Sequence, residues 1–187
     1  MKDEINITKE ILEKGGIILY PTDTIWGVGC DALNEKAVKK VYRLKKRKAD
    51  KACIILVDSL EMLAKYVSFI PEKAFSLIKE DFERPFTIIY PKAKNLPESV
   101  LATDGSIAVR VVKTGFSAAL IKELGKPIIS TSANLSGEPF PKGFNDIHED
   151  IKSKVDKIVD PKFDSSKGHT SKIVKFDESS KLEVIRE

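Results

Sequence analysis

Short apolar runs and longer amphipathic segments alternate along most of the chain. Apolar runs bounded by glycine, proline or polar residues predict buried strands at 17–20, 54–57, 86–90, 106–111 and 127–129. Apolar residues at helical spacing predict helices at 4–14, 34–46, 60–63, 71–78, 116–124 and, weakly, 144–155. Edge strands are expected at 157–159, 172–176 and 182–185. This alternation predicts an α/β layer fold, and we expect one domain over 1–187.

The stretch from 15 to 32 is the part of the sequence around which we build the prediction of a functional site. Two glycines open the buried strand 17–20, Pro21 closes it, and the polar residues 22–24 follow at once. In open α/β sheets, ligands bind in crevices at the ends of strands. We therefore expect a binding loop here, and an ordinary strand followed by a turn is the alternative.

A dinucleotide-binding fingerprint is a further alternative for this stretch. Gly27, Gly29 and Ala32 fit the pattern G-x-G-x-x-A. That fingerprint needs its first glycine directly after the strand, so that the pyrophosphate meets a helix N-terminus. Because the predicted strand ends near Pro21, we disfavour this interpretation.

Composition favours a cytoplasmic protein without a membrane segment. No apolar run reaches the length of a membrane span, and the polar N-terminus lacks the features of a signal peptide. Cys30 and Cys53 lack the spacing of a zinc site or a disulfide framework, so we expect small buried core residues. We also expect residues 161–171 to form a mobile loop.

The formal net charge is only +4, but basic residues crowd one short segment. They are Lys39, Lys40, Arg43, Lys45, Lys46, Arg47, Lys48 and Lys51. Such a cluster favours an anionic partner, either a nucleotide or nucleic acid. A solvated helix end is the alternative.

Three polar features follow predicted strands or helices: the loop with Thr22 and Thr24, the basic cluster, and the hydroxyl-rich segment 130–136. Alternation along 106–111 adds Arg110 on one face with Ser106 and Ala108. Cations and hydroxyls without an evident nucleophile–base pair favour phosphate chemistry. The chain has no Walker sequence, which excludes a P-loop enzyme.

Several short motifs follow one another from the organising stretch to the end of the chain. They are Tyr20-Pro21-Thr22-Asp23-Thr24-Ile25-Trp26-Gly27-Val28-Gly29-Cys30-Asp31-Ala32, Lys45-Lys46-Arg47 with Lys51, Pro85-Phe86-Thr87, Ser106-Ile107-Ala108-Val109-Arg110, Ser130-Thr131-Ser132-Ala133-Asn134-Leu135-Ser136-Gly137 and Ser171-Lys172-Ile173-Val174. In this order they resemble the motifs of the YrdC/TsaC family, the threonylcarbamoyl-adenylate synthases. Departures lie beside the motifs: Lys48 and Ala52 replace prolines, and Lys172 replaces a threonine.

The resemblance implies a YrdC-like fold, a twisted mixed β-sheet flanked by helices with a basic concave cleft, in the short, single-domain form. It implies that L-threonine, bicarbonate or CO₂, and ATP give L-threonylcarbamoyl-AMP and pyrophosphate. Mg²⁺ is expected with ATP, and no metal site of the protein's own is expected. The product would supply the proteins that complete threonylcarbamoyladenosine in tRNA.

The resemblance also assigns roles to individual residues. It implies that Thr24, Arg110, Ser130 and Ser171 hold the threonine or carbamate. It implies nucleotide binding by Arg47, Lys51, Ser106, Ser132 and Asn134. We expect Lys45 and Arg47 to act in catalysis.

Two competing functions stay open at this point. The first is a non-catalytic module that binds double-stranded RNA or tRNA through the same basic cleft, with strong salt dependence. The second is a carbamoyl-transfer domain of the kind found in hydrogenase-maturation proteins, whose other portions this sequence lacks.

Overall fold

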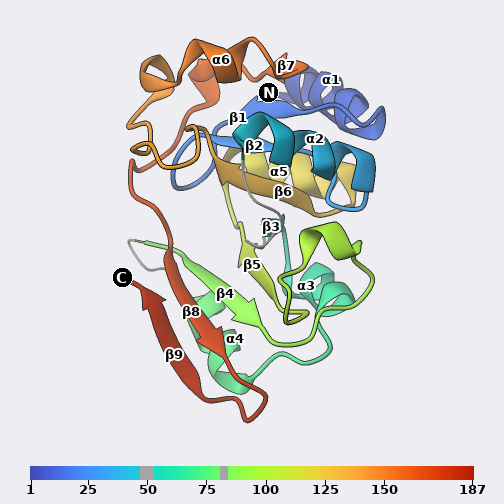
Figure 1. Ribbon diagram of the computed structural model, residues 1–187, viewed down its shortest axis with the longest axis vertical. Helices are drawn as coiled ribbons and strands as arrows, with labels where there is room; N and C mark the ends of the chain where they lie inside the picture. Colours follow the sequence, from blue (N-terminus) through green and yellow to red (C-terminus); the bar gives the residue numbers. More distant parts are fainter. Residues whose placement is uncertain (47–52, 81–83) are drawn as a thin grey trace.

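A computed structural model describes residues 1–46, 53–80 and 84–187. In these residues, nine strands form one mixed sheet in the order β7-β1-β2-β6-β3-β5-β4-β8-β9. The strands are β1 (Ile18–Tyr20), β2 (Gly27–Gly29), β3 (Ile54–Val57), β4 (Phe86–Tyr90), β5 (Ile107–Val111), β6 (Ile128–Ser132), β7 (Lys157–Ile158), β8 (Lys172–Phe176) and β9 (Leu182–Arg186). Figure 1 shows β1, β2, β6 and β7 in the upper half and the other strands in the lower half.

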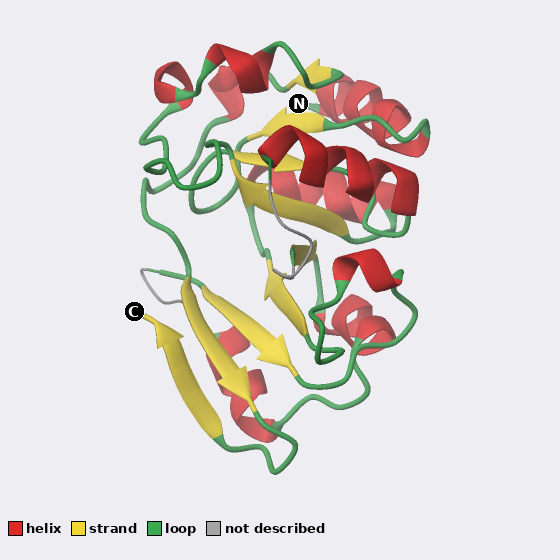
Figure 2. Ribbon diagram, in the orientation of Figure 1, coloured by secondary structure: helices red, strands yellow, loops and turns green. Residues whose placement is uncertain are grey.

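Helices flank both halves of the sheet (Figure 2). They are α1 (Lys2–Glu13), α2 (Glu35–Lys45), α3 (Leu60–Tyr66), α4 (Glu72–Lys79), α5 (Gly115–Leu124) and α6 (Glu149–Lys152). Helices α1 and α5 pack against each other beside the upper strands, whereas α3 packs on β3 and β5 and α4 packs on β4. The predicted α/β class with a mixed, twisted sheet is therefore confirmed. No helix of the described residues is long and apolar enough to cross a membrane.

The sheet mixes parallel and antiparallel pairs around β6. Strand β6 runs antiparallel to β2 on one edge and to β3 on the other. The parallel pairs are β1 with β7, β3 with β5, and β4 with β8. Strand β6 therefore joins the two halves of the sheet, and the polar segment that follows Ile129 begins inside it.

Local signals explain where the helices begin and end. The Asn34 side chain accepts a hydrogen bond from the Ala37 N–H at 3.1 Å, which caps α2. The Ser59 hydroxyl accepts one from the Met62 N–H at 3.1 Å and caps α3 in the same way. Helix α5 ends at Gly125, whose φ of 69° is the left-handed conformation that glycine adopts without strain. These boundaries match the sequence prediction closely.

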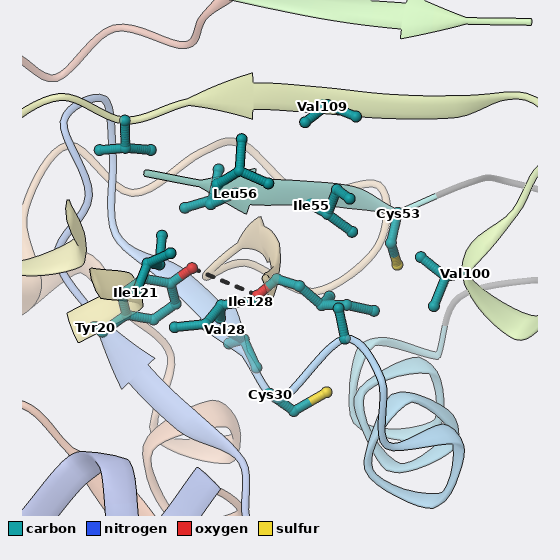
Figure 3. Close-up of a cluster of buried hydrophobic side chains, with 14 of the residues drawn as sticks. Tyr20, Val28, Cys30, Cys53, Ile55, Leu56, Val100, Val109, Ile121 and Ile128 are labelled. Atoms are coloured by element: carbon teal, nitrogen blue, oxygen red, sulfur yellow. Dashed lines mark hydrogen bonds between the residues drawn. The ribbon is translucent and has the colours of Figure 1, made fainter. Parts of the chain in front are cut away.

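The core lies between the sheet and its helices (Figure 3). Tyr20, Val28, Ile55, Leu56 and Ile128 are fully buried in it. The Tyr20 hydroxyl donates to the Ile129 carbonyl at 3.4 Å, the bond drawn in Figure 3.

Cys30 and Cys53 are both buried, as the sequence predicted. Burial raises the pKa of the Cys30 thiol.

Three element predictions need correction. Strand β8 pairs with β4 and with β9, so residues 172–176 are not an edge strand. The helix predicted over 144–155 is reduced to a 3₁₀ turn at Phe144–Asp146 and the short α6. Residues 27–29, interpreted as part of a loop, form strand β2.

Strand β2 depends on the absence of a side chain at Gly29. A Cβ atom there would lie 2.3 Å from the Ile129 carbonyl oxygen and 2.8 Å from the Tyr20 ring. The glycine thus serves close packing between β1 and β6. Gly27, the first glycine of the G-x-G-x-x-A pattern, lies in strand β2 and not at a strand-to-helix turn, which agrees with our preference against a dinucleotide fingerprint.

Candidate active site

A large cleft of about 820 Å³ opens on one face of the sheet. It brings together predicted site residues from across the sequence, namely Thr24, Lys45, Ser106, Arg110, Ser130, Ser132, Asn134 and Ser171. Arg47 and Lys51, also predicted for this site, lie outside the described residues. The structure thus confirms that the described candidates converge, while their individual roles stay predictions.

Strand register sets the floor of the cleft. Ser130 on β6 pairs with Ile54 on β3, Ile54 pairs with Ala108 on β5, and Ala108 pairs with Ile89 on β4. Ile89 in turn pairs with Lys175 on β8. This row crosses five adjacent strands and all its members line the cleft. It gives a largely apolar floor with a hydroxyl at one end and an ammonium group at the other.

Arg110 is buried in the wall of the cleft, with only 5 % of its side chain exposed. Its Nη2 lies 3.1 Å from Oδ1 of Asp23 and donates to the Thr22 hydroxyl at 3.4 Å. Its buried Nε has no hydrogen-bond partner among the described residues. A buried donor without an acceptor is unfavourable, so this atom is a candidate donor to an anionic ligand group; the Oδ1 of Asp23 is likewise buried without a hydrogen-bond partner among the described residues.

The loop after β1 holds its hydroxyls through local hydrogen bonds. Thr22 Oγ1 donates to the Ile25 carbonyl at 2.7 Å and accepts the Thr24 N–H at 3.1 Å. The Thr22 and Thr24 hydroxyl oxygens lie 2.9 Å apart. This arrangement holds the Thr24 side chain on the cleft side of the loop.

Lys45, at the end of α2, is buried against the segment that follows β6. Its Nζ donates to the Ser132 carbonyl at 2.5 Å, to the Asn134 carbonyl, and to Asn134 Oδ1 at 3.1 Å. The Ser132 hydroxyl donates to the same Asn134 Oδ1 at 2.5 Å. Lys45 therefore brings a positive charge to the cleft wall and also shapes the 132–134 segment.

Ser171, just before β8, also lines the cleft. Its hydroxyl is 2.7 Å from the Thr87 hydroxyl, and its carbonyl accepts hydrogen bonds from Arg186 Nε at 3.2 Å and Nη2 at 2.7 Å. Arg186 on β9 lines the cleft. Burial, and then the charges of Arg84 and Arg110, lower the pKa of its guanidinium.

Sequence reasoning missed Arg186, Lys175 and Asp104 as cleft residues. Asp104 accepts the Ser106 N–H at 3.0 Å and lies 3.3 Å from Lys175 Nζ. Hydrogen bonds from Ser106, and then from Lys175, lower the pKa of this carboxyl. The only signal in the sequence was alternation along β8, which places Lys175 on the same face as Ile173.

The charge of the described cleft lining is positive on balance. Its cations are Lys45, Arg110, Lys175 and Arg186, and its carboxylates are Asp104 and Glu138. Within the part of the chain that the structure describes, no group of three His, Cys, Asp or Glu side chains could hold a metal ion. The cleft is therefore suited to anions with several oxygens.

The segment predicted as a mobile loop, 161–171, makes specific contacts with the 22–26 loop. The Trp26 indole N–H donates to Asp164 Oδ2 at 2.6 Å, and the Gly168 N–H donates to the Thr24 carbonyl at 3.0 Å. Trp26 also packs on Phe144, with ring centroids 5.0 Å apart. Trp26 therefore packs between the 22–26 loop and the later segments of the chain.

Comparison with known families gives a match over nearly the whole chain. The model of the Sua5/YciO/YrdC family, described as telomere recombination, matches residues 10–187. Among similar curated proteins is a threonylcarbamoyl-AMP synthase of Pyrococcus abyssi, 34% identical over 157 residues. That alignment covers 84% of this chain but 46% of the relative, so the chain spans about half its length. A threonylcarbamoyl-AMP synthase of Pseudoalteromonas translucida is 38% identical over 142 residues, covering 74% of this chain and 76% of the relative.

Among solved structures, the chain is similar to proteins of the same family. P. abyssi Sua5 in complex with L-threonine has a TM-score of 0.82 and 32% identity, and the match covers 91% of this chain and 50% of that one. E. coli YciO has a TM-score of 0.84 and 27% identity, with coverage of 100% and 90%.

Proposed function

Because the chain belongs to the Sua5/YciO/YrdC family, we propose that it is a threonylcarbamoyl-AMP synthase, an enzyme of the nucleotidyltransferase class. The proposed reaction converts L-threonine, bicarbonate or CO₂, and ATP into L-threonylcarbamoyl-AMP and pyrophosphate. The observation that carries the proposal is the convergence of predicted threonine-side and nucleotide-side residues in one cationic cleft. The names of the similar proteins and the threonine complex of P. abyssi Sua5 support the same substrate.

The proposed chemistry needs charge neutralisation more than a protein nucleophile. The amine of threonine adds to CO₂ and releases a proton, which gives a carbamate. A carbamate oxygen then attacks the α-phosphorus of ATP, and the bond from that phosphorus to pyrophosphate breaks. Carbamate, carboxylate and triphosphate repel one another, so fixed cations and oriented hydroxyls that hold them together lower the barrier.

The threonine side of the site consists of Thr24, Arg110, Ser130 and Ser171. In this proposal the Arg110 Nε donates to the carboxylate of threonine, because it is a buried donor for which the described residues provide no acceptor. The hydroxyls of the other residues bind the remaining polar groups of threonine and its carbamate.

The nucleotide side consists of Arg47, Lys51, Ser106, Ser132 and Asn134, with the charge of Lys45 close by. Mg²⁺ is proposed to enter with the phosphates of ATP, where it neutralises their charge. The product is proposed to serve the cytoplasmic proteins that transfer threonylcarbamoyl to tRNA, and the proposal includes contact of this chain with tRNA.

The direct test is pyrophosphate release from Mg²⁺-ATP, measured with and without L-threonine and with and without bicarbonate. We expect release to require both, and mass spectrometry to detect a threonylcarbamoyl adenylate. L-Alanine and L-serine serve as substrate controls. Pyrophosphate release that does not depend on L-threonine, or no release at all, contradicts the proposal.

A matched pair of variants tests the basic segment. Arg47→Ala should lower adenylate formation by orders of magnitude and leave the fold intact, because it removes a cation from the nucleotide side. Arg43→Ala, on the exposed side of α2, should keep wild-type activity.

RNA binding without adenylate formation would favour the competing binding module instead.

A further inference from the structure

Asp23 lies behind Arg110 and outside the cleft. The described residues that line the large cleft do not include it. Its side chain is 21 % exposed and borders a separate, smaller cavity of about 120 Å³. Its Oδ1 lies 3.1 Å from Arg110 Nη2. The Asp23 side chain therefore forms an ion pair with the guanidinium of Arg110 without lining the cleft, although its sequence neighbours Thr22 and Thr24 do line it.

The guanidinium of Arg110 has two different sides. The Nη2 atom forms an ion pair with Asp23 Oδ1, which has no hydrogen-bond partner among the described residues, and donates to the Thr22 hydroxyl. The buried Nε has no acceptor among the residues that the structure describes. Because the guanidinium is planar, fixing Nη2 and the aliphatic stem also fixes the direction of the Nε–H bond.

From this geometry we infer that Asp23 is a positioning residue for substrate recognition. It holds Arg110 from behind so that Nε–H points at the carboxylate of L-threonine. The inference rests on the proposed function, because L-threonine is the ligand that it names. It assigns to Asp23 a role that requires no contact with substrate.

Two physical effects support this role. An arginine side chain without a partner samples several rotamers, and ordering it on binding weakens affinity. A buried cation without a counter-charge is also strongly unfavourable. Only 5 % of the Arg110 side chain is exposed. Asp23 supplies the counter-charge in the empty site, while its own side chain keeps some contact with solvent. The wild-type site is thus already organised before the amino acid arrives.

The test compares two ligands in several variants by isothermal titration calorimetry, with a non-hydrolysable ATP analogue present. The ligands are L-threonine and L-threoninol, which lacks the carboxylate. In Asp23→Ala we expect the Kd of L-threonine to rise about tenfold or more. The Kd of L-threoninol should change less than about twofold, because the group that Arg110 binds is missing. The Kd of the ATP analogue should also stay the same.

Two further variants separate positioning from folding. Asp23→Asn keeps an oxygen next to Nη2 and should show a smaller loss for L-threonine, still without a loss for L-threoninol. Asp31→Asn is the matched control, because Asp31 Oδ2 also lies 3.1 Å from a cation, Lys126 Nζ, outside the cleft. It should lower the melting temperature and leave the Kd of L-threonine unchanged. If Asp23→Ala does not fold, Asp23→Asn carries the comparison.

The outcomes are distinguishable. Equal losses for L-threonine, L-threoninol and the ATP analogue overturn the inference and assign Asp23 to folding alone. An unchanged Kd for L-threonine in Asp23→Ala also overturns it and leaves the proposed function standing. A wild-type protein that does not bind L-threonine overturns both.

Discussion

The ammonium group of Lys45 lies 3.1 Å from Oδ1 of Asn134, and the same nitrogen donates to the carbonyls of Ser132 and Asn134. Lys45 is 3% exposed. A lysine at the end of helix α2 therefore determines the shape of a segment that follows β6, far along the chain. If the chain acts as proposed, the effect of Lys45 on the nucleotide depends on that segment as well as on its charge.

Lys45→Met should show both effects. It keeps the length of the side chain but leaves buried oxygens without donors, so the free energy of unfolding should fall by about 1–3 kcal/mol. Adenylate formation should fall at least about tenfold, since both the charge and the 132–134 segment are disturbed. Chemical denaturation and pyrophosphate release measure the two effects.

Lys40→Met is the control for this prediction. Lys40 lies on the same helix, and its Nζ donates to the Gly15 carbonyl at 3.0 Å, away from the cleft. We expect wild-type activity from it. Equal losses of activity in the two variants would contradict a special role for Lys45.

Arg186→Gln should lower activity because the variant binds the anionic groups of the nucleotide or the carbamate less well. The change removes a half-buried cation that lines the cleft and weakens the hydrogen bonds to the Ser171 carbonyl. We expect kcat/KM to fall about tenfold or more. Arg84→Gln is the matched control, because Arg84 donates to the Thr170 carbonyl at 3.1 Å but does not line the cleft. A larger effect from Arg84→Gln would refute this assignment.

Gly29→Ala should destabilise the fold. The new Cβ would lie 2.3 Å from the Ile129 carbonyl oxygen, so β2 and β6 would have to move apart. Overpacking of this kind costs about 1–3 kcal/mol or more. Gly143→Ala is the control, because nothing lies within 4 Å of a Cβ there and its φ of −162° is ordinary extended backbone. Thermal unfolding of the two variants gives the comparison, and equal melting temperatures would disprove the packing explanation.

The free energy of unfolding at acid pH should depend on Glu4. Burial alone would raise the pKa of this carboxyl, but hydrogen bonds from Lys157 and the Asp160 N–H lower it below 4.5 in the folded chain. Its contribution to stability is therefore complete above the unfolded pKa and is lost as the pH falls through the lower folded pKa. Glu4→Gln should reduce stability at neutral pH and make the curve flatter below about pH 4.5. Denaturation midpoints across this range measure the effect, and parallel curves would contradict it.

Elements with local signals were predictable from sequence. The start of α2 follows from the capping residue Asn34, and the strand from Ile54 follows from a short apolar run. Strand β2 was not predictable, because Gly27–Gly29 has no strand propensity and is held by the contact of Gly29 with β6. The inner position of β8 depends on pairing with β9, and register between distant strands leaves no local pattern.

The same distinction applies to the site. Thr24, Arg110 and Ser171 belong to contiguous motifs, so sequence reasoning found them and the cleft brings them together. Arg186 belongs to no such motif and reaches Ser171 only because β9 lies beside β8. The contact of Asp23 with Arg110 likewise requires two segments that meet only in the folded chain.

Strand β6 is bordered by β2 on one edge and by β3 on the other, and it carries both Ser130 and Ser132. A substrate bound to these hydroxyls depends on the integrity of the upper and the lower halves of the sheet together. Ligand binding should therefore raise the temperature of one cooperative unfolding transition, with a shift that grows with the logarithm of ligand concentration. Partial unfolding of either half alone would release the ligand.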